Sequence, residues 1–117
     1  MSWLSDKNLG VFDATDLVVI CSAINKYFPG VTRFNVFTPY FISSHHPYFS
    51  WEIAAKINGI TGQPYMRICH VMVEPAARGK GFGTKIVGNL LHHFTRHRFS
   101  YYELVAKNDR CARFWHR

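Results

Sequence analysis

Long apolar segments are what this sequence most plainly lacks. No run of apolar residues approaches the length that a helix needs to cross a bilayer. The first residues also lack the basic stretch followed by an apolar one that marks a secretory leader. We therefore expect a cytoplasmic protein with no membrane partner.

Cysteines are few, and their number is odd. Cys21, Cys69 and Cys111 lie far apart in the sequence, which predicts small buried thiols rather than a disulfide framework. Linkers, repeats and low-complexity segments are also missing. Because 48% of the residues are hydrophobic and 16% are aromatic, we expect one folded domain over residues 1–117.

Acidic residues are scarce as well. Seven Asp and Glu oppose 14 Lys and Arg, so the net charge is +7 and the pI is about 9.6. Such a surface suits an anionic ligand, an acidic acceptor protein or nucleic acid. The cations are spread along the chain, and no helix-turn-helix, zinc-finger or RNA-binding motif accompanies them. A solvated basic surface explains the charge as well as a nucleic-acid site does.

The most informative feature present is a glycine-rich run at residues 78–83, with the sequence RGKGFG. An apolar strand-like stretch at residues 68–73 precedes it, and an amphipathic helical pattern at residues 84–97 follows. A helix N-terminus after a strand offers unpaired backbone N–H groups to an anion, and glycines let backbone approach it closely. The run therefore predicts a site for a phosphate-bearing ligand. The alternative is a tight turn without a ligand.

The run matches neither a Walker A loop, a dinucleotide fingerprint nor a kinase glycine loop. With Val-Glu-Pro at residues 73–75, its Arg-x-x-Gly-x-Gly pattern resembles the coenzyme A pyrophosphate loop of the GNAT superfamily of N-acetyltransferases. The later pieces of that family's core also have counterparts here, in the correct order. They are a helix at residues 84–97, a strand at 101–106, Asn108, and Phe-Trp at 114–115. The resemblance covers residues 66–117, a little under half of the chain.

Periodicity predicts the remaining elements. Asp13 is a suitable N-cap for a first helix that runs to about residue 28, and residues 82–94 carry a second apolar helical stripe. Residues 38–48, with two prolines, are expected to be irregular, and residues 58–64 to form a hairpin turn. Strands are predicted at residues 31–37, 51–57, 65–73 and 101–106, and a short helix after Asn108. The fold class is α/β, a single-domain GNAT-like mixed sheet flanked by helices.

The resemblance implies that acetyl-CoA is the acyl donor and that an amine attacks its thioester directly. The backbone of one strand would then hold the pantetheine arm, and the amides of the loop would hold the pyrophosphate. A backbone N–H near Met72 or Val73 would stabilise the oxyanion. The implied coenzyme-binding residues are Val71, Met72, Val73, Arg78, Gly79, Lys80, Gly81, Phe82, Gly83, Thr84, Asn108 and Trp115.

Two positions depart from the family's catalytic pattern. Trp115 stands where many members carry a tyrosine that protonates the leaving thiolate, and an indole N–H cannot replace it, which leaves solvent as the acid. Arg67 stands near the position of the glutamate base of some relatives. His70 on the same strand is the nearest titratable alternative and is the predicted catalytic base. The other reading of His70 is a hydrogen-bonded core histidine. Weaker candidates are Glu52, His45 and His46, and no metal site is predicted from the spacing of His and Cys.

The third departure is at the end of the chain. Family members usually continue with a Gly-Phe turn and two further strands, whereas this chain stops at Arg117. Strand 101–106 would then be an exposed edge, or another chain would cover it. A second copy of this chain that completes the sheet is one such partner. Two functions fit: an N-acetyltransferase for a protein or small amine, and a non-catalytic module that binds coenzyme A or a protein. A nucleic-acid-binding module is the third and weakest option.

Overall fold

A mixed β-sheet with two helices forms the described part of the chain. The computed structural model describes residues 6–95 and 98–105. The strands are β1 (Lys7–Asn8), β2 (Arg33–Thr38), β3 (Phe41–His45), β4 (Phe49–Ile57), β5 (Pro64–Val73) and β6 (Tyr101–Leu104). The helices are α1 (Ala14–Asn25), α2 (Phe82–Thr95) and a 3-10 turn at Pro75–Ala77.

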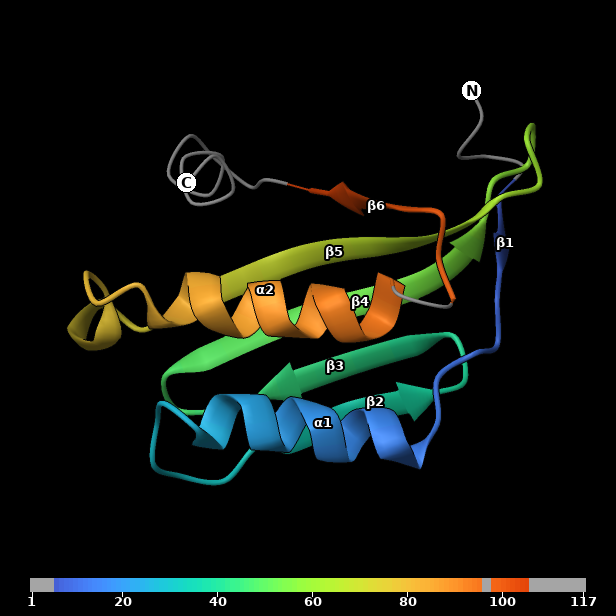
Figure 1. Cartoon of the computed structure of the whole chain (residues 1–117). Helices are drawn as coiled ribbons and strands as arrows, with labels where there is room; N and C mark the ends of the chain where they lie inside the picture. The colour runs from blue at the N-terminus through green and yellow to red at the C-terminus, as the bar shows by residue number, and fades with distance from the viewer. Residues whose placement is uncertain (1–5, 96–97, 106–117) are drawn as a thin grey trace.

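The strand order β2-β3-β4-β5-β6 places β4 and β5 in the middle of the sheet, and β1 pairs with one end of β4 (Figure 1). Neighbouring strands are antiparallel except β5 and β6, which are parallel and joined through α2. The predicted mixed sheet flanked by helices is therefore confirmed.

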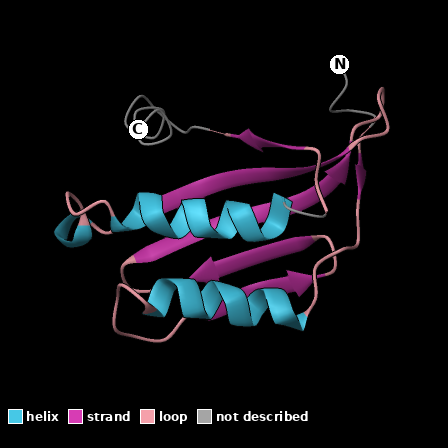
Figure 2. Ribbon diagram, viewed as in Figure 1, coloured by secondary structure: helices cyan, strands magenta, loops and turns pink. Residues whose placement is uncertain are grey.

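Both helices lie side by side on one face of the sheet (Figure 2). The alternating pattern of β4 explains this, because Phe49, Trp51, Ile53 and Ala55 are buried while the residues between them are half-buried. These side chains form one core with the apolar stripes of α1 and α2. The opposite face of the sheet carries the polar residues of β4 and β5.

Helix α1 begins at a capping box, with Asp13 as the predicted N-cap. The Asp13 side chain accepts a hydrogen bond from the Asp16 amide (3.2 Å), and the Asp16 side chain accepts one from the Asp13 amide (2.9 Å). Asp16 also contacts two side chains, one at the end of α2 and one beyond it. Arg98 donates to both of its carboxylate oxygens at 2.7 and 2.6 Å, and the ring of His93 lies 2.9 Å from Oδ1. The fully buried Asp16 thus ties the first turn of α1 to the C-terminal end of α2.

This contact predicts a loss of stability in acid. Burial alone would raise the pKa of Asp16, but hydrogen bonds from Arg98 and His93 outweigh it and hold the pKa below its ordinary value of 3.8. A depressed pKa in the folded state contributes stability above the unfolded value, and this stability is lost as the pH falls through the folded value. We expect urea midpoints to fall steadily below about pH 4. The Asp16→Asn variant should be less stable at neutral pH and should lose this part of the acid dependence; an identical pH profile in the variant would contradict the assignment.

One predicted segment is wrong. Residues 38–48 were expected to be irregular, yet they contain β3, which lies between β2 and β4. β3 shows no alternation of apolar and polar residues, because two buried serines, Ser43 and Ser44, stand near its centre. Pairing with neighbours on both sides satisfies the strand's backbone and overrides the poor apolar pattern.

The other elements fall near their predicted places. Helix α1 ends at Asn25 rather than near residue 28, and it is followed by a turn in which the amides of Tyr27 and Phe28 both donate to the carbonyl of Ile24. The short helix expected after Asn108 lies outside the described residues. No helix within residues 6–95 and 98–105 is long and apolar enough to span a membrane.

Candidate functional site

The site lies along the C-terminal half of β5, beyond its described pairing with β6. Their parallel pairing runs from Tyr65–Tyr101 to Ile68–Leu104, and the amide of Val105 donates to the carbonyl of Ile68 at 2.9 Å. β5 continues to Val73, past the residues that face the described part of β6 (Figure 1). The backbone of Val71, Met72 and Val73, which sequence reasoning assigned to the pantetheine arm, lies on this extension.

A β-bulge interrupts β5 at the start of the extension. Glu52 pairs with Cys69 and Ser50 pairs with Met72, so Trp51 alone faces two residues, His70 and Val71. His70 has φ 55°, the sole positive φ of a non-glycine residue among those described. A left-handed conformation costs a side-chain-bearing residue about 1–2 kcal/mol, and such strain is concentrated at functional sites. The bulge turns Cys69 and His70 toward one face, although neighbours in a regular strand point to opposite faces.

The glycine-rich loop at the end of β5 has room for a ligand. Gly79 (φ 91°) and Gly81 (φ 75°) are left-handed, and a Cβ at either position would meet nothing within 4 Å. Helix α2 starts at Phe82, and its first backbone hydrogen bond runs from the Lys85 amide to the Gly81 carbonyl at 3.1 Å. The amides of residues 82–84 therefore have no acceptor within the helix, as an anion site requires.

Arg78, the first residue of the glycine-rich run, contacts the strand that precedes it. Its Nε donates to the carbonyl of Val73 at 2.7 Å, so the side chain folds back onto the end of β5. Its Nη1 is buried and has no hydrogen-bond partner within the described residues. A buried guanidinium nitrogen without a partner is costly unless an anion completes it. Lys80 is exposed and adds charge at the loop.

Together these features fit the pyrophosphate of a coenzyme A molecule. Open space at two glycines and the unpaired start of α2 lie on one loop, and Arg78, with its buried Nη1, is the first residue of that loop. Of the other predicted residues, Gly83 is buried in the first turn of α2, while Phe82 is half-buried and stacks on Tyr27 with centroids 5.0 Å apart. Asn108 and Trp115 lie outside the described residues.

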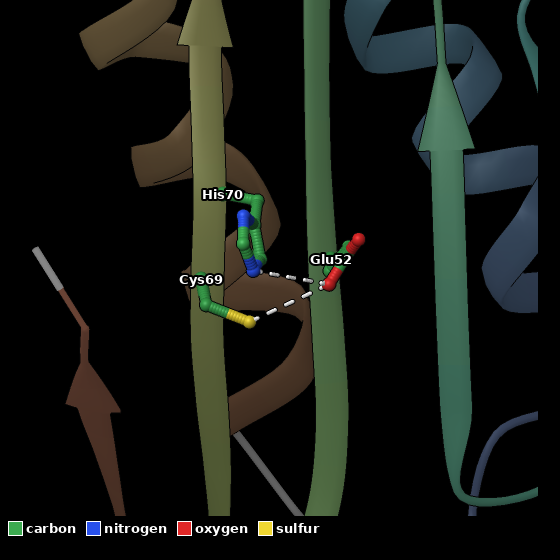
Figure 3. A group of neighbouring side chains, drawn as sticks. All are labelled: Glu52, Cys69 and His70. Carbon is green, nitrogen blue, oxygen red and sulfur yellow. Dashed lines mark hydrogen bonds and ion pairs between the residues drawn. The ribbon is translucent and has the colours of Figure 1, made fainter. Parts of the chain in front are cut away.

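Three reactive side chains meet at the bulge (Figure 3). The Cys69 thiol donates to Glu52 Oε2 at 3.7 Å, and His70 Nε2 lies 3.7 Å from the same oxygen. The His70 side chain is 48% exposed and that of Glu52 is 32% exposed. The reading of His70 as a core histidine is therefore wrong, because its ring lies at the surface beside a carboxylate.

The other candidates do not join this group. His45 is exposed on β3, where its Nε2 lies 3.0 Å from the hydroxyl of Ser43. His46 is 7% exposed, accepts a hydrogen bond from the Tyr48 amide at 3.0 Å and packs against Phe28. Burial lowers the pKa of His46, and a backbone hydrogen bond at Pro29 offsets this only in part. We therefore assign His46 to the fold rather than to catalysis.

Comparison with known families agrees with this geometry. The model of the acetyltransferase (GNAT) family matches residues 30–117, most of the chain and all of the site. The chain belongs to the GNAT acetyltransferase family. No curated protein matches its sequence significantly.

Solved structures show the same fold as this GNAT domain at low sequence identity. The ribosomal-protein-alanine N-acetyltransferase of Brucella melitensis biovar Abortus 2308 is 12% identical, with a TM-score of 0.55 over 95% of this chain and 86% of that one. The aminoglycoside acetyltransferase meta-AAC0020 from an uncultured soil metagenomic sample, in complex with trehalose, is also 12% identical, with a TM-score of 0.58 over 95% and 84%.

A third similar structure is a transcriptional regulator from Bacillus halodurans C-125. It is 19% identical, with a TM-score of 0.52 over 65% of this chain and 55% of that one. The GNAT domain thus spans about half the length of the regulator and over four fifths of the two transferases. All three likenesses concern the fold.

Proposed function

We propose that this GNAT domain is an N-acetyltransferase that moves an acetyl group from acetyl-CoA to an amine. One observation carries the proposal: the glycine-rich loop, with its open glycines, follows the end of β5 that bears His70. The proposal thus puts phosphate binding and a titratable group at the two ends of one backbone segment.

The coenzyme would be held by backbone more than by side chains. The amides of residues 82–84 and the two left-handed glycines would bind the pyrophosphate, with Arg78 Nη1 and Lys80 supplying positive charge. The extended backbone of Val71, Met72 and Val73 would pair with the pantetheine arm. We also retain Asn108 and Trp115 as coenzyme-binding residues of the proposal.

Acetyl-CoA supplies an activated thioester, so the protein's contribution is position and proton transfer. His70 would take the proton from the attacking amine. The Glu52 carboxylate, 3.7 Å from Nε2, would keep the ring in place and attract its positive charge. A backbone N–H of Met72 or Val73 would bind the developing oxyanion, a contribution of about a hundredfold in rate for one donor. Solvent would protonate the leaving thiolate.

The acceptor is an amine of a protein or of a small molecule. The names of the two transferases above include acceptors of both kinds, a ribosomal-protein alanine and an aminoglycoside. The net charge of +7 favours an acceptor with acidic groups near its amine. A cytoplasmic location, a single domain over residues 1–117 and completion of the sheet by a second copy stay predictions from the sequence.

Amine-dependent release of the coenzyme A thiol tests this function. We expect release with natural protein, across a panel of acidic peptides and small polyamines, and at least a hundredfold less with Gly81→Glu, whose carboxylate would occupy the loop and repel the pyrophosphate.

Gly62→Glu is the matched control for that variant. Gly62 has φ 72°, is exposed, and has equally open space around it, but it lies in the 58–64 turn. Both variants therefore carry the same backbone strain and the same added charge. Equal activity in the two variants would contradict the proposed place of the coenzyme, and no release with any amine would contradict the activity.

A further inference from the structure

The proposed reaction leaves one group of the cluster in Figure 3 without a role, the Cys69 thiol. We propose that Glu52, Cys69 and His70 form a site for a divalent transition metal ion, with Zn²⁺ as the best match, and that an ion bound there stops acetyl transfer. The second half of this statement rests on the proposed function, whereas the first half does not.

The distances between the donor atoms carry the argument. One oxygen, one sulfur and one ring nitrogen all lie within 4.8 Å of one another, and both the sulfur and the nitrogen are 3.7 Å from Glu52 Oε2. Zinc bonds of about 2.0–2.3 Å in a tetrahedron separate such atoms by about 3.3–3.5 Å. The two distances to Glu52 Oε2 exceed this separation by a few tenths of an ångström, and the third is at most 4.8 Å, so rotations of these partly exposed side chains would close the site.

The chemistry of the three donors selects the ion. Thiolate and imidazole favour Zn²⁺ over Mg²⁺ or Ca²⁺, which prefer oxygen ligands alone. The charges of one carboxylate and one thiolate would balance a divalent ion. Binding would replace the Cys69–Glu52 hydrogen bond with bonds from both residues to the ion, and the thiol proton would pass to solvent. Three protein ligands leave a fourth position for water, as in exchangeable zinc sites.

The bulge is what creates the site. Cys69 and His70 are adjacent in the sequence, and a regular strand would direct them to opposite faces. The left-handed His70 brings both donors to the face of the sheet away from the helices, opposite Glu52 on β4. Because His70 Nε2 would become a metal ligand, it could no longer accept a proton from the amine. The ion would act as a reversible inhibitor of the proposed enzyme.

Titration with Co²⁺ tests the site without any assay of activity. The full chain carrying Cys21→Ser and Cys111→Ser has Cys69 as its one remaining thiol. We expect Co²⁺ to produce near-ultraviolet thiolate absorption and intense visible bands of tetrahedral geometry, and Zn²⁺ to abolish both. Cys69→Ser in this background should remove the ultraviolet band, and Glu52→Gln or His70→Asn should each weaken binding at least about tenfold.

His92→Asn is the control, because His92 is an exposed histidine on α2. Absence of the bands, or bands that persist unchanged in Glu52→Gln and His70→Asn, would overturn the site and leave an ordinary polar cluster.

The inhibition is tested separately with Zn²⁺ in the thiol-release assay. We expect Zn²⁺ to inhibit natural protein, a chelator to reverse the effect, and Cys69→Ser to be at least about tenfold less sensitive. Equal sensitivity of the two proteins would overturn the regulatory role, whereas loss of all acetyl transfer would affect the proposed function and leave the Co²⁺ result standing.

Discussion

Replacing His70 with asparagine is expected to lower kcat/KM for acetyl transfer by about 10²–10⁴-fold, the usual contribution of a positioned general base. Asparagine is the right replacement because it tolerates φ 55° far better than alanine does. The bulge, the direction of β5 and the backbone offered to the coenzyme should therefore persist. Affinity for acetyl-CoA should change little, since the loop at Gly79–Gly81 is untouched.

A matched histidine variant separates a base from a general loss of a surface imidazole. His92 is exposed on α2, away from the bulge, so His92→Asn should retain the rate of natural protein. Equal activity of His70→Asn and natural protein would show that another group, or water, accepts the proton. A variant that loses acetyl-CoA binding along with activity would instead point to a disturbed backbone.

Asp16→Ala should give the largest loss of stability, about 3–5 kcal/mol in the free energy of unfolding. The side chain of Asp16 is fully buried, whereas those of Arg98 and His93 are only 23% and 27% exposed. Removal of the carboxylate would leave these two groups beside Phe94 with no anion among the contacts described. The variant would also lose half of the capping box of α1.

Asp13→Ala is the matched control for this prediction. Asp13 is exposed and serves the same capping box, and only a through-space attraction links it to Arg98, so its loss should cost only about 1 kcal/mol. Urea unfolding of both variants at neutral pH measures the difference. Similar losses in the two would mean that the ion cluster contributes little and that capping accounts for the whole role of Asp16.

Much of the fold was predictable because local and global signals agree. The Asp13 cap, the alternation of β4 and the apolar stripe of α2 each fit the final packing. β3 was not predicted, because Ser43 and Ser44 occupy buried positions where apolar residues are expected. Pairing with β2 and β4, which lie on either side in space, determines that strand, and periodicity within the segment cannot show it.

The site also has a part that the sequence predicts and a part that it does not. The glycine-rich loop could be predicted because left-handed turns and helix starts have strong sequence signatures. The cluster of Glu52, Cys69 and His70 could not be predicted, because side chains of neighbours such as Cys69 and His70 point to opposite faces of a regular strand. A histidine carries no sign of a left-handed conformation, so the bulge became visible only through its register against β4.

The central claim is that coenzyme A binds where the glycine-rich loop meets the start of α2. Isothermal titration of natural protein, Gly81→Glu and Gly62→Glu with acetyl-CoA and with desulfo-CoA tests it most directly. We predict binding of both ligands by natural protein and by Gly62→Glu, and no detectable binding by a folded Gly81→Glu. Binding by Gly81→Glu as tight as that of natural protein, or no binding by natural protein itself, would contradict the claim.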